Sequence, residues 1–142
     1  MQKALLLISL TMLVACSQPE VEVVVYKSPT CGCCNKWITH LEQNGFKIST
    51  KDMQDVTPVK IQNGLTPQLA SCHTALVDGY VIEGHVPASD IKRLLKERPA
   101  VRGLSVPGMP VGSPGMEQGD RKEPYNVVTF NDKGETSIFS SY

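Results

Sequence analysis

The most reactive part of the sequence is a group of three cysteines within four positions, Cys31-Gly32-Cys33-Cys34. The group follows an apolar run and stands at the start of a helical pattern. Unpaired backbone N–H groups and the helix dipole favour negative charge at such a position, so thiols there lose their protons more easily. The segment therefore predicts a thiolate site that either exchanges disulfides or binds a soft metal.

A metal explains the crowding of the cysteines better than structural disulfides do. A bridge between the neighbours Cys33 and Cys34 would be strained, and three thiolates so close repel one another unless a cation neutralises them. Cys31 and Cys34 nevertheless have the C-x-x-C spacing of thiol oxidoreductases, in which Cys31 would attack and Cys34 would resolve. The additional Cys33 serves no step of that exchange.

The elements that position these cysteines follow from periodicity and turn residues. Residues 21–26 form an apolar, β-branched run that predicts a strand, and Thr30 is expected to cap a helix that runs to about residue 44. Further strands are expected over 46–52, 74–77 and 80–83, helices over 57–63 and from Pro87 to Pro99, a Gly/Pro-rich loop over 103–115, and a terminal hairpin over 125–139. This order predicts a single α/β domain of thioredoxin-like fold, β-α-β-α-β-β-α, with an appended C-terminal β-hairpin.

The turn Asp78-Gly79 fixes the register of the two strands beside it, because this dipeptide favours a two-residue hairpin loop. Counting outward from the turn, Cys72 faces His85. Directly opposed Cβ atoms lie about 4.5–5.5 Å apart, within reach of one shared metal ion. We therefore expect Cys72 and His85 to form a ligand pair, and His73 to lie on the other face of the sheet unless a bulge intervenes.

The remaining soft donors decide which metal is favoured. Met109 lies in the Gly/Pro-rich loop and Met116 follows it, and neither stands on an apolar helical face. Thiolate and thioether ligands select Cu(I), whereas tetrahedral Cys/His sites without methionine more often select zinc. Together with Cys72 and His85 the methionines favour copper, while a zinc-stabilised binding module remains an alternative. His40, on the first helix beyond the cysteines, is expected to be solvated.

Composition and the first residues bear on location. The 142-residue chain has 14 basic and 14 acidic residues, which gives no electrostatic reason to expect nucleic acid or an anionic membrane as a partner. Residues 1–16 combine Lys3 with an apolar stretch and end in a lipobox-like sequence at Cys16, which predicts a signal peptide and lipidation of Cys16. Residues 17–142 would then form one domain in the periplasm, anchored to a membrane by lipid.

Four separated segments resemble the CopG family of periplasmic copper-resistance proteins, which is distinct from the plasmid repressor of the same name. They are residues 26–34, 71–75, 83–87 and 106–117. The resemblance extends over essentially the whole mature chain. It implies a thioredoxin-like fold, a C-x-C-C motif that binds several copper ions as a copper–sulfur cluster, and a role in periplasmic copper handling with Cu(I)/Cu(II) interconversion.

The same resemblance implies ligands and partners. The thiolates would be Cys31, Cys33, Cys34 and Cys72, with His85 and Met109 as capping ligands and His73 and Met116 as further candidates. Copper ions, several as Cu(I), would be the cargo, and other periplasmic copper-handling proteins the partners. The chain is then a metal-binding protein with copper redox activity at most, rather than an enzyme with catalytic side chains.

Residues 26–45 also resemble arsenate-reductase-like proteins, which keeps a thiol–disulfide enzyme as the alternative. In that interpretation Cys31 is the nucleophile and Cys34 the resolving thiol. Two features count against it. The predicted export disfavours a cytosolic enzyme, and thioredoxins carry a cis-proline before the third strand, where this chain has Cys72-His73-Thr74.

Overall fold

A computed structural model describes residues 21–142 of the chain. The predicted signal peptide and Cys16 lie outside the described residues. Within residues 21–142, seven strands form one mixed sheet in the order β2-β1-β3-β4-β5-β6-β7. The elements are β1 (Glu22–Lys27), α1 (Gly32–Gln43), β2 (Lys47–Asp52), α2 (Thr57–Gln62), β3 (Thr74–Val77), β4 (Tyr80–Glu83), α3 (Ala88–Glu97), β5 (Gly103–Ser105), β6 (Asn126–Phe130) and β7 (Thr136–Ser141).

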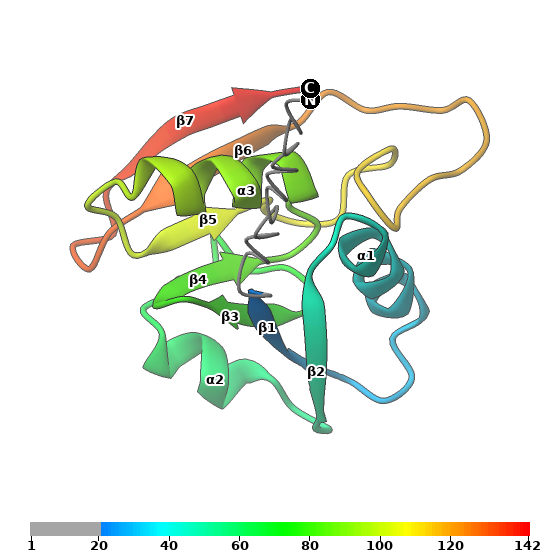
Figure 1. Ribbon diagram of the computed structural model, residues 1–142, viewed down its shortest axis with the longest axis horizontal. Helices are drawn as coiled ribbons and strands as arrows, with labels where there is room; N and C mark the ends of the chain where they lie inside the picture. The colour runs from blue at the N-terminus through cyan, green and yellow to red at the C-terminus, as the bar shows by residue number, and fades with distance from the viewer. Residues whose placement is uncertain (1–20) are drawn as a thin grey trace, which may run out of the picture.

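Two helices cover one face of the sheet, and their apolar stripes form the main core. Helices α1 and α3 pack here (Figure 1), and Trp37, Leu41 and Ile91 are fully buried against strand residues such as Val25 and Ile82. The spacing of Trp37, Ile38 and Leu41 places them on one side of α1, as the sequence predicts. This core holds the N-terminus of α1, and with it the cysteine motif, against the ends of β1 and β3.

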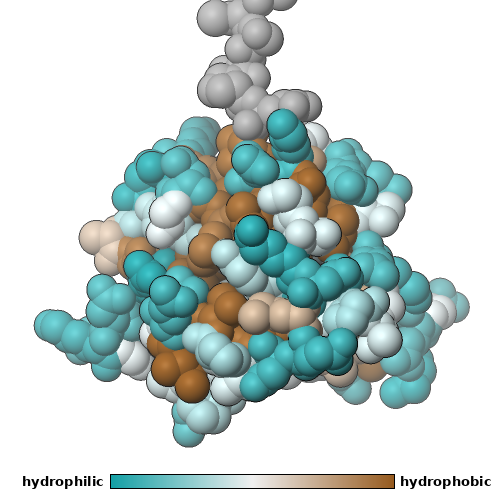
Figure 2. All heavy atoms as spheres, turned by 90° about the horizontal axis from the view of Figure 1, so that it is seen from below, coloured by the Kyte–Doolittle hydropathy of each residue, from teal (hydrophilic) through white to brown (hydrophobic). Residues whose placement is uncertain are grey.

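The opposite face carries the short helix α2 and a smaller core of Leu65, Leu69, Val81 and Phe130. Helix α2 itself buries no residue, and Ile61 on it is 70% exposed. The space-filling view from this side shows apolar patches interrupted by polar side chains (Figure 2). Along the described chain, no helix combines the length and the hydrophobicity that crossing a bilayer requires.

The mixed α/β class and the expected order of elements are confirmed, with two differences in detail. The N-cap of α1 is Cys31 rather than Thr30. In addition, β5 lies at the start of the segment expected to be a loop, and it pairs parallel to β4 and antiparallel to β6. A side chain at Gly103 would place its Cβ 1.8 Å from the carbonyl oxygen of Val81, so this glycine permits close strand approach instead of marking a turn.

Candidate metal centre

The cysteine motif is held at the first turn of α1. The Sγ of Cys31 accepts a hydrogen bond from the backbone N–H of Cys34 at 3.3 Å, which satisfies one of the unpaired donors at the helix N-terminus. A sulfur therefore takes the capping role that Ser, Thr or Asp usually plays. The first turn contains no acidic residue, so no carboxylate competes with a thiolate for the positive end of the helix.

Four sulfur atoms from two distant parts of the chain meet at this point. Cys31 and Cys34 form a disulfide, whereas Cys33 and Cys72 are free thiols. The Cys33 Sγ lies 3.5 Å from that of Cys31 and 3.9 Å from that of Cys72, and Cys34 Sγ lies 3.6 Å from Cys72 Sγ. All four sulfurs lie within 4.8 Å of one another. The convergence expected from the sequence is present, with two of the thiols oxidised.

The hairpin delivers Cys72 to the site in the register that the sequence predicts. Strand β3 pairs with β4 so that Val77 faces Tyr80. Beyond the strand ends, Cys72 Sγ lies 3.0 Å from Nε2 of His85. The Asp78-Gly79 turn thus brings a thiol and an imidazole from the segments that flank the two strands into direct contact.

His73 lies on the same side as the cysteines, so the prediction that it faces away was wrong. Its ring centroid is 4.4 Å from that of Trp37, and its Nδ1 lies 3.2 Å from Cys72 Sγ. Strand β3 begins only at Thr74, whose hydroxyl accepts a bond from Lys60 on the α2 side. Strand alternation then directs His73 toward α1, and the bend before it turns Cys72 to the same side.

Neighbouring backbone fixes the orientation of His85. Its Nδ1 donates to the carbonyl oxygen of Pro114 at 2.8 Å, which leaves the lone pair of Nε2 directed at the Cys72 sulfur. Gly115 follows at φ +87°, and a Cβ there would lie 2.8 Å from both Cys33 O and Trp37 N. The loop can therefore approach the imidazole this closely only with glycine at position 115.

Burial keeps both imidazoles neutral. Desolvation lowers the pKa of His85, against opposing effects from the Pro114 carbonyl and the Glu117 carboxylate. Desolvation, followed by the nearby His85, lowers the pKa of His73 well below its usual value. Neutral imidazoles are the form that binds metals. Among the described residues, Nε2 of His73 is the one buried side-chain nitrogen or oxygen without a hydrogen-bond partner.

The thiol of Cys72 is protonated in the metal-free protein. Desolvation raises its pKa to about 12, and the neighbouring Cys33 adds to the shift. Its proton can lie between Sγ and the free lone pair of His85 Nε2, which is 3.0 Å away. Since the thiolate is the ligand form, a metal ion must displace this proton.

The two methionines border the site from different sides. Gly108 donates to the Ala70 carbonyl at 3.1 Å and accepts from the Ser71 hydroxyl, which places Met109 beside the bend before Cys72. Met109 is 48% exposed. Met116 lines a hollow of about 340 Å³ together with Cys33. The ligand roles of the two thioethers stay predictions.

A buried polar network behind the site was not anticipated from the sequence. The carboxylate of Glu83, with no exposed surface, accepts from the Ser71 N–H and the Thr74 hydroxyl, each at 2.6 Å, and from the Lys60 ammonium. Desolvation raises the pKa of Glu83, while the Lys60 charge opposes the shift. Because Ser71 precedes Cys72, this carboxylate fixes the bend that aims the thiol. The sequence signal that could have predicted this network is the pairing of a glutamate with a threonine across the hairpin.

His40 is not simply solvated, contrary to expectation. Its Nε2 accepts the backbone N–H of Ala88 at 3.1 Å, so it satisfies a donor at the N-terminus of α3. Burial lowers the pKa of His40, which favours the neutral form that can accept this bond.

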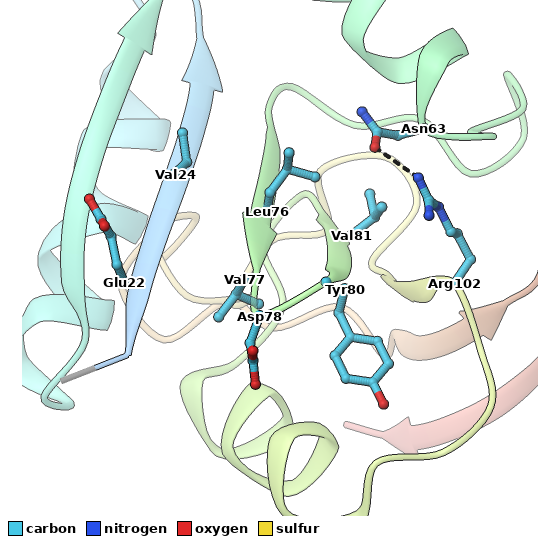
Figure 3. A pocket seen from close by; sticks show the side chains of 10 residues that line it. Glu22, Val24, Asn63, Leu76, Val77, Asp78, Tyr80, Val81 and Arg102 are labelled. Atoms are coloured by element: carbon cyan, nitrogen blue, oxygen red, sulfur yellow. Dashed lines mark hydrogen bonds between the residues drawn. The ribbon is translucent and has the colours of Figure 1, made fainter. Parts of the chain in front are cut away.

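A second hollow of about 340 Å³ lies away from the cysteines, at the turn end of β3 and β4 (Figure 3). Arg102 donates to the Asn63 side chain at its rim, at 3.1 Å. The residues that line this hollow include no cysteine, histidine or methionine. It therefore offers no soft donor for copper.

Comparisons with known proteins agree with this site. Residues 69–116, which hold Cys72, both buried histidines and the methionine loop, match a family model described as "Protein of unknown function, DUF411". No curated protein sequence matches the chain. Two solved structures, described as forms 1 and 2 of the copper resistance protein copG, are 46% identical, with TM-scores of 0.82 and 0.83, and each comparison covers 87% of this chain and 98% of the other. At this identity and coverage, and with the cysteine cluster in place, the chain belongs to the CopG family of copper resistance proteins.

Proposed function

We propose that the protein binds Cu(I) outside the cytoplasm, as part of copper handling and resistance, in a cluster held by Cys31, Cys33, Cys34 and Cys72. The observation that carries the proposal is the convergence of these four sulfurs within 4.8 Å. The choice of copper as the metal follows from the two similar structures, because both are described as copper resistance proteins. Several thiolates in one pocket match the preference of Cu(I) for soft ligands.

The cluster requires the reduced form of the motif. Reduction of the Cys31–Cys34 disulfide by an external dithiol or phosphine adds two electrons and two protons and yields two thiols. Copper ions then displace the thiol protons. Each sulfur can bridge two ions, so a few thiolates can hold several Cu(I) at low coordination number. His85 and His73 lie where they can cap such a cluster, and Met109 and Met116 would extend the donor set outward.

Location and redox activity belong to the same proposal. The predicted signal peptide supports export to the periplasm, and the predicted modification of Cys16 supports anchoring to a membrane by lipid. The nitrogen donors beside the sulfurs support interconversion of Cu(I) and Cu(II), because imidazole also suits Cu(II).

An anaerobic Cu(I) titration of the reduced full chain tests the cluster. We expect native mass spectra to show more than one copper per chain, with Cys33→Ser and Cys72→Ser each reducing the number bound. His40→Gln is the matched control, because it alters a half-buried imidazole outside the cluster. Failure of the reduced chain to retain Cu(I), or displacement of Cu(I) by equimolar zinc, would contradict the proposal and favour a zinc module.

The Cys31–Cys34 disulfide supports a second candidate, thiol–disulfide exchange. A C-x-x-C disulfide at a helix N-terminus is the arrangement that oxidoreductases use. An insulin-reduction assay on metal-free protein separates the two functions. Rapid turnover that depends on Cys31 and is indifferent to Cys33 would favour the enzyme, and the copper-binding function predicts negligible turnover.

A further inference from the structure

The disulfide removes two of the four sulfur ligands but leaves a second donor group untouched. Cys72, His73 and His85 each offer one ligand atom, and these three atoms lie within 4.8 Å of one another. None of the three belongs to the Cys31–Cys34 disulfide. These three donors therefore remain together in the oxidised protein.

We propose that, while the Cys31–Cys34 disulfide is closed, Cys72, His73 and His85 bind one Cu(II) ion. The site differs from the thiolate cluster in donor set, in the number of ions and in the state of the disulfide. It rests on the proposed function only in taking copper as the cargo.

The distances between the donors suit a single ion. Tetrahedral bonds of about 2.3 Å to sulfur and 2.0–2.1 Å to nitrogen separate a sulfur and a nitrogen donor by about 3.6 Å. The observed separations from Cys72 Sγ are 3.0 Å to His85 Nε2 and 3.2 Å to His73 Nδ1. Insertion of the ion therefore needs the donors to part by only about half an ångström, roughly a small side-chain rotation.

Both imidazoles can present a lone pair to the ion. The bond from His85 Nδ1 to the Pro114 carbonyl places the ring proton on Nδ1 and leaves Nε2 free. No neighbour fixes a proton on either nitrogen of His73, because Nε2 is unpartnered and Nδ1 contacts only the Cys72 sulfur. The two rings meet edge to face with centroids 5.1 Å apart, so both can approach one ion from different directions without a clash.

The composition of the site accommodates the divalent state. One thiolate and two imidazoles form the His₂Cys set that holds Cu(II) in electron-transfer sites. The set also limits the charge, because one thiolate against a divalent ion leaves a single net positive charge in a half-buried pocket. Four thiolates, by contrast, suit Cu(I). The state of the disulfide would therefore choose which oxidation state of copper the protein holds.

Retention of Cu(II) beside a thiolate requires that the thiolate is not oxidised. That reaction consumes two Cu(II) and two thiolates and yields two Cu(I) and one disulfide. Among the described residues, Cys33 is the one other free thiol, 3.9 Å from Cys72. A Cys33→Ser chain that also carries Cys16→Ser has no second free thiol while the disulfide is closed, so the sulfur of Cys72 has no partner within the molecule.

The test is addition of one equivalent of Cu(II) to this oxidised double variant. We expect one copper per chain by mass, an electron paramagnetic resonance signal, and a visible sulfur-to-Cu(II) charge-transfer band. The mass should remain that of the closed disulfide. A further Cys72→Ser change should abolish the band, and His85→Gln should weaken binding about 10- to 100-fold. His40→Gln should leave the affinity unchanged.

Three results would overturn the inference: no charge-transfer band, a band that survives Cys72→Ser, or conversion of Cu(II) to a silent Cu(I) form. Co(II) provides a redox-inert second probe in the same variant, and the inference requires a sulfur-to-Co(II) band as well. The Cu(I) titration of the reduced chain is a separate measurement. The Cu(II) titration can therefore contradict the oxidised-state site without contradicting the Cu(I) cluster, and the Cu(I) titration can contradict the cluster without contradicting the oxidised-state site.

Discussion

Replacement of Lys60 by methionine should be among the most damaging single changes outside the cysteine cluster. Methionine keeps the apolar stem but removes the charge that faces Glu83, whose side chain has no exposed surface. Loss of one partner of a buried ion pair costs about 3–5 kcal/mol. Glu83 keeps its bonds from Ser71 and Thr74, each at 2.6 Å, so we expect the lower end, about 3 kcal/mol.

Urea unfolding of the oxidised chain measures this loss. With a slope of about 1–3 kcal/mol per molar urea, the midpoint should fall by about 1–3 M. The loss should also shrink at acid pH. Burial raises the pKa of Glu83 in the folded protein, and without Lys60 the folded state takes up a proton more readily than the unfolded state. The penalty is thus largest above the folded pKa and disappears as the carboxyl group becomes protonated.

Lys51→Met is the matched control, because Lys51 lies exposed on the edge strand β2. It should change the free energy of unfolding by less than about 0.5 kcal/mol. A loss below about 1 kcal/mol for Lys60→Met, or a loss independent of pH, would refute the view that Glu83 is ionised and held by Lys60. Lys60→Met should also lower the affinity for Cu(I), because Glu83 fixes the bend beside Cys72.

Three further changes test other contacts. Gly115→Ala should destabilise the protein by about 2 kcal/mol, measured by urea unfolding, because position 115 has φ +87° and a new Cβ would meet backbone atoms at 2.8 Å. His40→Gln should flatten the decline of stability with acidification, because folding lowers the pKa of His40. The neutral imidazole therefore contributes its full stabilisation above pH 6.5, the usual pKa, and this stabilisation is lost as the pH falls through the folded pKa. Tyr142→Phe should cost about 1 kcal/mol in thermal unfolding, because the Tyr142 hydroxyl donates to the buried Asp90 carboxylate at 2.9 Å.

The parts of the site set by local rules were predictable from the sequence. Asp78 and Gly79 both adopt positive φ, 46° and 86°, as the two-residue turn requires, and the resulting register brings Cys72 to His85. Alternation holds from Thr74 to His73 but fails at Cys72, because the count was continued outward through a bend that precedes the first paired residue of β3. The start of the strand at Thr74 was predicted correctly, but the bend at Cys72 depends on contacts from Glu83 and Gly108 that residue types alone do not give.

Other features depend on tertiary placement or on the state of the protein. Lys60 reaches Glu83 only because α2 packs over that strand, and sequence patterns do not give the position of a six-residue helix on a sheet. Strand β5 is three residues long and begins with Gly103, so its glycine suggested a loop. The spacing of Cys31 and Cys34 is compatible with both thiolate and disulfide, because redox state depends on the surroundings as well as on the sequence.

The position of Trp37 gives the protein a built-in optical reporter. It is the single tryptophan in the chain, its indole N–H is fixed to the Val86 carbonyl at 2.9 Å, and its ring packs on His73. Tryptophan emission from this protein, excited above the range that tyrosine absorbs, therefore originates from one rigid point beside the metal-binding groups. Cu(II) that arrives there should quench the emission, whereas zinc should leave it bright, so occupancy can be followed in unlabelled protein.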